Sequence, residues 1–111
     1  MVEVKATVQF VKLARKAMSD EKLQELVDWL VLNPQAGVVI IGTGGIRKLR
    51  WQTGKDNKGK SGGVRVLYYY ENNMLVVLLI TLYRKSDKEN IDANEKACLK
   101  KMLPELLRDY I

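Results

Sequence analysis

The spacing of apolar residues changes near residue 10, and the change predicts two kinds of element. Every second residue over 2–10 is apolar, which indicates a half-buried strand. From Phe10 to Met18 the spacing becomes helical. Ser19 is a suitable N-cap for a second helix, whose apolar residues recur at helical spacing until Asn33 and Pro34 end it.

Beyond residue 37 the pattern predicts β-structure and then a final helix. A Gly-Val-Val-Ile stretch leads through a glycine-rich turn, 42–45, into a strand over 46–51. Two further strands, over 64–70 and 74–85, are rich in Val, Leu, Ile and Tyr. The polar segment 53–63 predicts a loop between the first two strands. Asp92 and Glu95 resemble a capping box, so we expect a C-terminal helix that packs its leucines and Met102, with a kink or break at Pro104.

These elements define an α+β fold: an N-terminal strand and helices, a three-stranded antiparallel meander, and a C-terminal helix. The 111 residues fit one domain over 1–111, and a hydrophobic content of 47% with 29% charged residues is ordinary for a folded protein. One cysteine allows no internal disulfide, the N-terminus lacks a secretion signal, and the longest apolar run is too short to span a membrane. We therefore expect a cytoplasmic protein.

The net charge of +6 is concentrated in one segment. Seven basic residues lie within 47–65, opposed only by Asp56, whereas basic and acidic residues balance in the rest of the chain. A localised cationic segment favours contact with nucleic acid or phosphate over a merely solvated loop. The basic residues are Arg47, Lys48, Arg50, Lys55, Lys58, Lys60 and Arg65.

Several kinds of active site are excluded by composition. The chain has no histidine, so imidazole-based RNA cleavage and Ser-His-Asp or Cys-His arrangements are absent. One cysteine without histidine leaves no zinc site, and a single acidic residue in the basic segment disfavours a magnesium centre there. We expect no cofactor. We interpret Cys98 as a buried structural thiol and 42–45 as a turn rather than a phosphate loop.

Period-two alternation places several cations on chosen faces of the strands. Lys48 and Arg50 share one face of their strand, Arg65 points with Leu67 and Tyr69, and Tyr83 and Lys85 lie opposite Arg84. An arginine inside an apolar strand is costly unless it is paired with a carboxylate or faces a solvent-filled groove. Both explanations stay open for a single arginine, but cations on three strands favour the groove.

Three motifs in this order resemble the strand core of the RelE/HigB toxins, particularly the HigB branch: GGIRKLR at 44–50, GGVRVLYY at 62–69 and LYRKS at 82–86. The similarity covers about 30–103, and the preceding helices fit the layout of the family. The resemblance implies a small endoribonuclease that enters the ribosomal A site and cuts bound mRNA. It also implies a cognate antitoxin, HigA-like with a helix-turn-helix, through which the toxin would contact DNA only indirectly.

The resemblance assigns catalytic roles to Lys48, Arg65, Lys85 and Tyr83, in a metal-independent attack of the ribose 2′-hydroxyl on the neighbouring phosphate. Two family positions differ, because Ile46 replaces a basic residue and Ile91 lies where some RelE members have a tyrosine. Further contacts to RNA and the ribosome are expected from the remaining cations, Arg47, Arg50, Lys55, Lys58, Lys60 and Arg84.

Two alternative functions stay open, and the first of them keeps the fold. A ParE-like relative would inhibit DNA gyrase and use the cationic segment as a contact surface. A non-enzymatic RNA-binding module would retain RNA intact. The presence of basic residues on all three strands favours the nuclease.

Overall fold

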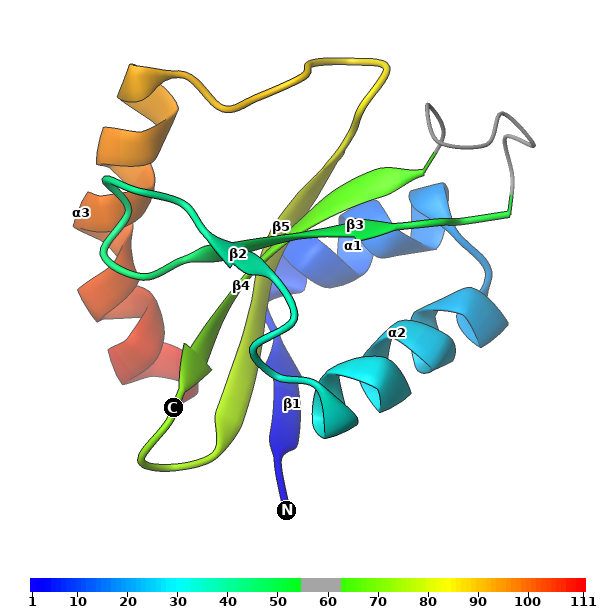
Figure 1. The fold of residues 1–111 in the computed structure, drawn as a ribbon, viewed down its shortest axis with the longest axis horizontal. Coiled ribbons are helices and arrows are strands. Elements are labelled where there is room, and N and C mark those ends of the chain that lie inside the picture. Colours follow the sequence, from blue (N-terminus) through cyan, green and yellow to red (C-terminus); the bar gives the residue numbers. More distant parts are fainter. Residues whose placement is uncertain (55–62) are drawn as a thin grey trace.

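A mixed β-sheet with helices on both faces forms the framework of the protein (Figure 1). The computed structural model describes residues 1–54 and 63–111. Its elements, in chain order, are β1 (Glu3–Ala6), α1 (Val8–Ala17), α2 (Asp20–Leu32), β2 (Val38–Val39), β3 (Arg47–Trp51), β4 (Val64–Glu71), β5 (Val76–Arg84) and α3 (Ala93–Tyr110).

The strands lie in the order β1-β5-β4-β3-β2. β1 is parallel to β5, with Glu3 opposite Val76, and the other neighbours are antiparallel. The predicted meander of three strands, β3-β4-β5, is confirmed. The sequence did not predict β2, which extends the meander by two exposed residues at the sheet edge.

The first strand is shorter than its alternating pattern predicted, because Thr7 ends it. The Thr7 hydroxyl accepts a hydrogen bond from the Phe10 N–H at 3.0 Å and donates one to the Ile80 carbonyl at 2.7 Å. Thr7 is therefore the N-cap of α1 and also fastens that helix to β5. Ser19 caps α2 as predicted, and α2 ends at Leu32 with Asn33 as its C-cap.

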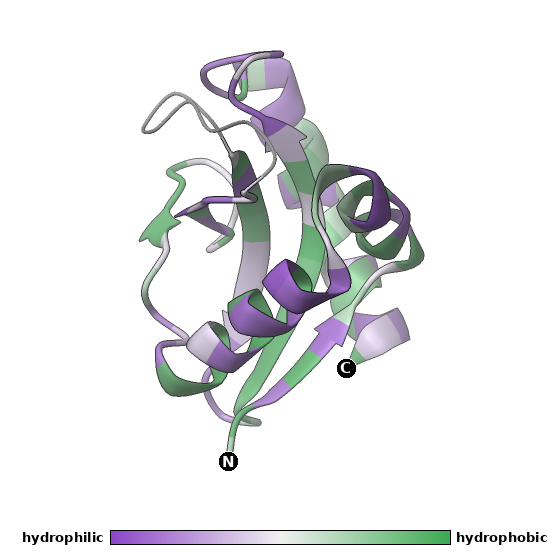
Figure 2. Cartoon of the chain, turned by 90° about the vertical axis from the view of Figure 1, so that its right-hand side faces the viewer, coloured by the Kyte–Doolittle hydropathy of each residue, from purple (hydrophilic) through white to green (hydrophobic). Residues whose placement is uncertain are grey.

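Each face of the sheet has its own hydrophobic core. One core joins α1 and α2 to β4 and β5, with Phe10, Leu26 and Tyr68 among its fully buried residues. The other joins α3 to the opposite face through Leu67, Ile80 and their neighbours. Figure 2 shows apolar strands at the centre and hydrophilic positions along the outer sides of the helices.

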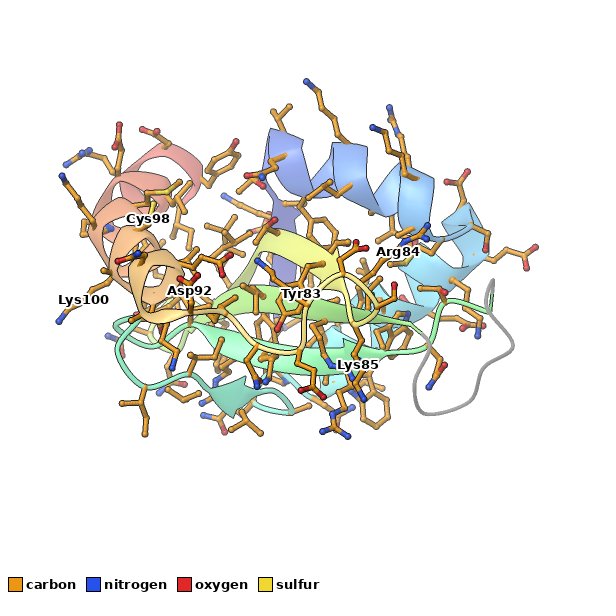
Figure 3. All side chains as sticks on the ribbon, turned by 90° about the horizontal axis from the view of Figure 1, so that it is seen from above. Tyr83, Arg84, Lys85, Asp92, Cys98 and Lys100 are labelled. Atoms are coloured by element: carbon orange, nitrogen blue, oxygen red, sulfur yellow. The ribbon has the colours of Figure 1, made fainter. Side chains whose placement is uncertain are left out.

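The capping box of α3 is confirmed, and of the kink or break predicted at Pro104, the break into two helices is not found. α3 runs as one helix from Ala93 to Tyr110 with Pro104 inside it. Proline has no N–H to donate to the Lys100 carbonyl. Pro104 and Lys100 are both exposed, so this carbonyl can accept a hydrogen bond from water instead. Figure 3 shows Lys100 pointing away from the protein.

Two residues of α3 are less buried than the pattern predicted. Met102 is 40% exposed rather than packed in the core. The interpretation of Cys98 as a buried thiol is wrong, because Cys98 is exposed and its Sγ lies 3.7 Å from Met102 Sδ. Both residues lie on the flank of the apolar stripe of α3. Among the described residues, no helix is long and apolar enough to cross a membrane.

Candidate functional site

Three side chains from adjacent strands form a row on the sheet face that carries α3. In the register of the sheet, Arg50 of β3 lies opposite Arg65 of β4, and Arg65 lies opposite Tyr83 of β5. Directly opposed residues of antiparallel strands project to the same face with their Cβ atoms about 5 Å apart. The alternation along each strand, together with this pairing, therefore brings the three residues together.

Arg65 is the central and most buried member of this row. It is only 4% exposed, and its Nη1 donates a hydrogen bond to the Val64 carbonyl at 3.3 Å. Within residues 1–54 and 63–111, ion pairs join Lys22 to Glu25 and Lys88 to Glu95, and neither pair includes Arg65. A buried guanidinium without a carboxylate partner in this part of the chain is suited to receive an external anion.

Lys48 lies on the same face, two residues before Arg50. Its register partner is Leu67, and its Nζ donates to Asn90 Oδ1 at 3.3 Å. Asn90 belongs to the loop 85–92 between β5 and α3, so this loop reaches from β5 past β4 to β3. Lys85 is the first residue of the loop and is half-buried.

Tyr83 is half-buried, and its hydroxyl oxygen is buried without a hydrogen-bond partner in the described part of the chain. Burial raises the pKa of Tyr83 above its ordinary value, while the charges of Lys88 and Arg65 act in the opposite direction and Glu95 adds to the rise. The phenol is thus protonated at neutral pH and available as a hydrogen-bond donor.

Other predicted contact residues lie elsewhere. Arg47 is on the opposite face beside Tyr68, and its Nη1 donates to the carbonyls of Gln35 and Gly37, at 3.2 and 2.7 Å. Arg84 is exposed and lies toward α1 and α2, whereas Lys85 lies away from these helices (Figure 3). Lys55, Lys58 and Lys60 lie outside the described residues.

Lys88 and Glu95 are parts of the site that the sequence analysis did not identify. The Lys88 ammonium lies 4.9 Å from the centroid of the Tyr83 ring and is paired with Glu95. The capping box predicted where Glu95 would be, but no spacing rule connects it to a lysine seven residues earlier. Within the described ranges, no group of three or more potential metal-ligating side chains occurs.

Gly63, the residue directly before β4, cannot be replaced by a residue with a side chain without strain. Gly63 has a φ of +82°, and a Cβ added there would lie 2.3 Å from the Trp51 carbonyl oxygen. A side chain is excluded both by conformation and by space. Gly63 is the glycine of the sequence Gly63-Val64-Arg65. It therefore allows the backbones of β3 and β4 to lie close together just before Arg65.

Comparison with known proteins places the chain in one family. The model of the family described as "RelE toxin of RelE / RelB toxin-antitoxin system" matches residues 2–109. The isolated RelE toxin of E. coli has a similar fold, with 19% identity and a TM-score of 0.57 over 88% of this chain and 96% of that one.

Two solved complexes contain chains of the same fold. One is the intact E. coli RelBE toxin–antitoxin complex, with 19% identity and a TM-score of 0.55 over 74% of this chain and 94% of that chain. The other is the RelE–RelB complex of the archaeon Pyrococcus horikoshii OT3, with 21% identity and a TM-score of 0.53 over 78% and 98%.

Proposed function

Because this chain belongs to the RelE toxin family of toxin–antitoxin systems, whose members are generally ribosome-dependent mRNA endonucleases, we propose that it cuts messenger RNA in the ribosomal A site. The observation that carries this proposal is the row Arg50–Arg65–Tyr83, with the Arg65 guanidinium buried at its centre and Lys48 on the same face. Cationic donors held in a buried position stabilise a phosphate that gains negative charge far better than mobile surface charges do.

The proposed reaction is a metal-independent transesterification. The ribose 2′-oxygen forms a bond to the adjacent phosphorus, the bond from phosphorus to the 5′-oxygen breaks, and the products carry a 2′,3′-cyclic phosphate and a 5′-hydroxyl. Arg65 would hold the non-bridging phosphate oxygens with its planar fork. Lys48 or Lys85 would accept the 2′-hydroxyl proton as the general base, and the protonated phenol of Tyr83 would donate to the leaving 5′-oxygen.

The finer assignment that we propose is a HigB-like toxin with a HigA-like antitoxin. It is supported by Tyr83, which occupies the tyrosine position at the end of the last strand in HigB-like members. Arg50 is exposed at the end of the row and would contact RNA outside the cleaved bond, as would Lys55, Lys58 and Lys60. These contacts predict salt-sensitive binding to the ribosome.

The test is incubation of the purified protein with ribosomes stalled on a defined mRNA, followed by mapping of new 5′ ends. New ends within the A-site codon, absent when ribosomes are omitted, support the proposal. Inhibition of gyrase supercoiling without RNA cleavage would instead establish the ParE-like alternative. Bound but intact mRNA would establish an RNA-binding module.

A further inference from the structure

The loop 85–92 is fastened to the first turn of α3 by a carboxylate that uses both of its oxygens. Glu95 Oε1 accepts the Asp92 N–H at 3.1 Å, and the Asp92 side chain accepts the Glu95 N–H at 2.8 Å. Glu95 Oε2 is paired with the Lys88 ammonium. Because the capping box already fixes the Glu95 side chain, that side chain can hold Lys88 with little further loss of conformational freedom.

Lys88 in turn lies against the aromatic ring of Tyr83. A distance of 4.9 Å from the ammonium to the ring centroid is within the range of a cation–π interaction. The Tyr83 hydroxyl has no hydrogen-bond partner among the described residues. Lys88 therefore contacts the face of the ring, and the buried hydroxyl makes no hydrogen bond of its own within the described residues.

Charged groups approach Tyr83 from three elements. Arg65 comes from β4, Lys88 from the loop and Glu95 from α3, and all three act on the ionisation of the phenol. Tyr83, Lys88 and Glu95 also line a cavity of about 370 Å³, whose wall is completed mainly by apolar residues of β5 and α3. Without Lys88, the ring would border this cavity with little to restrain its rotation.

We propose that Lys88, held by Glu95, is a positioning residue that orients Tyr83 so that its hydroxyl stays beside Arg65. Lys88 acts through Tyr83 and does not contact RNA itself. The inference rests on the proposed function for its catalytic consequence, but its structural part can be tested without RNA. It also makes the first turn of α3 a component of the site on the sheet.

The structural part is tested by NMR of protein carrying carbon-13 in the tyrosine rings, which gives signals from five residues. Tyr83→Phe assigns the Tyr83 signal. Lys88→Met and Glu95→Gln should shift that signal and leave the other four unchanged, whereas Lys88→Arg should preserve it because a cation remains. Lys22→Met is the matched control, since it breaks the ion pair with Glu25 on α2, and neither of these residues is among the charged groups that act on Tyr83. An unchanged Tyr83 signal in Lys88→Met would overturn the inference.

The catalytic part is tested by cleavage kinetics on programmed ribosomes. Lys88→Met should lower kcat about tenfold, as expected for a misplaced proton donor, with KM for ribosomes within about twofold. Lys88→Arg should restore most of the rate. In a Tyr83→Phe background, Lys88→Met should add no further loss, because Lys88 then has no hydroxyl to position.

The outcomes separate the two proposals. If Lys88→Met lowers kcat about tenfold in the Tyr83→Phe background as well, Lys88 contacts RNA directly. That result would overturn the positioning role. A wild-type protein that cleaves no mRNA would refute the proposed function and, with it, the catalytic part. The NMR comparison would still decide whether Lys88 and Glu95 orient Tyr83.

Discussion

Replacing Arg65 with methionine should remove cleavage and at the same time stabilise the protein. Arg65 is 4% exposed and donates to one main-chain carbonyl at 3.3 Å. A buried polar group without full pairing costs about 1–3 kcal/mol. The like charge of Arg50 directly opposite costs roughly 0.2–1 kcal/mol more. Methionine fills a similar volume and removes both costs.

The change also loses the hydrogen bond to the Val64 carbonyl, which contributes about 0.5–1.5 kcal/mol. The net expectation is a gain of about 1 kcal/mol in the free energy of unfolding, which raises Tm by about 4 °C for a domain of this size. Ribosome-dependent cleavage should fall at least about 100-fold, the usual loss when a donor to a developing oxyanion is removed.

The assays are urea unfolding of the purified variant and mapping of mRNA ends on ribosomes. Arg15→Met is the control, because Arg15 is exposed on α1 and its loss removes the same charge without touching the site. A destabilisation of more than about 1 kcal/mol by Arg65→Met would refute the reasoning. It would show that Arg65 supports the scaffold, so that lost activity no longer assigns it to the phosphate.

Three further changes test a buried hydrogen-bonding tyrosine on the opposite face of the sheet, the proline inside α3, and the ion pair at the site. Tyr68→Phe removes hydrogen bonds of 2.8 and 2.9 Å to main-chain groups and should cost about 1–3 kcal/mol. Because burial raises the pKa of Tyr68 above 10.0, wild-type stability should fall as pH rises from 10.0 through the folded pKa, and urea unfolding should show a smaller alkaline loss in the variant. Pro104→Ala supplies the N–H that the Lys100 carbonyl lacks and should raise stability by about 1–3 kcal/mol in thermal unfolding, and a lower Tm would mean that the proline ring itself packs. The hydrogen bond from Lys88 lowers the pKa of Glu95 below 4.5. The stability that ionised Glu95 adds to the folded protein is therefore complete above pH 4.5 and is lost as pH falls through the folded pKa. The stability difference between wild type and Glu95→Gln should therefore shrink in acid, and a difference independent of pH would argue against the pairing with Lys88.

The strands and caps could be predicted because their signals are local. Ser19 and Asp92 are the N-caps that their residue types indicated, and alternation placed Arg65 with Leu67, on the face opposite Val66. The parallel pairing of β1 with β5 could not be predicted in this way. It joins residues more than 70 positions apart, and no local spacing encodes that contact.

The parts of the site that escaped prediction depend on tertiary contacts. Charge counting treated Arg47 and Arg50 alike, yet the sheet places Arg50 in the row with Arg65 and Arg47 against main-chain carbonyls on the other face. Alternation alone places Arg47 and Arg50 on opposite faces of the strand, but it does not show which face carries the candidate site. Lys88 was missed for a similar reason, since its partners Tyr83 and Glu95 belong to different elements.

The face that carries α3 serves two purposes that compete. Along part of its length, Leu67, Ile80 and Leu103 form a hydrophobic core that anchors the helix. Two residues further along β4 and β5, Arg65 and Tyr83 continue the same face with polar groups. A helix that covered both parts would bury Arg65 further, although Arg65 is already only 4% exposed, and a helix that covered neither would leave the sheet unprotected. The loop 85–92 resolves this conflict, because it separates β5 from the start of α3 and contributes Lys88, while α3 reaches the site only with its first turn, through Glu95. The capping box at Asp92 thus determines where core packing ends and where the candidate site begins.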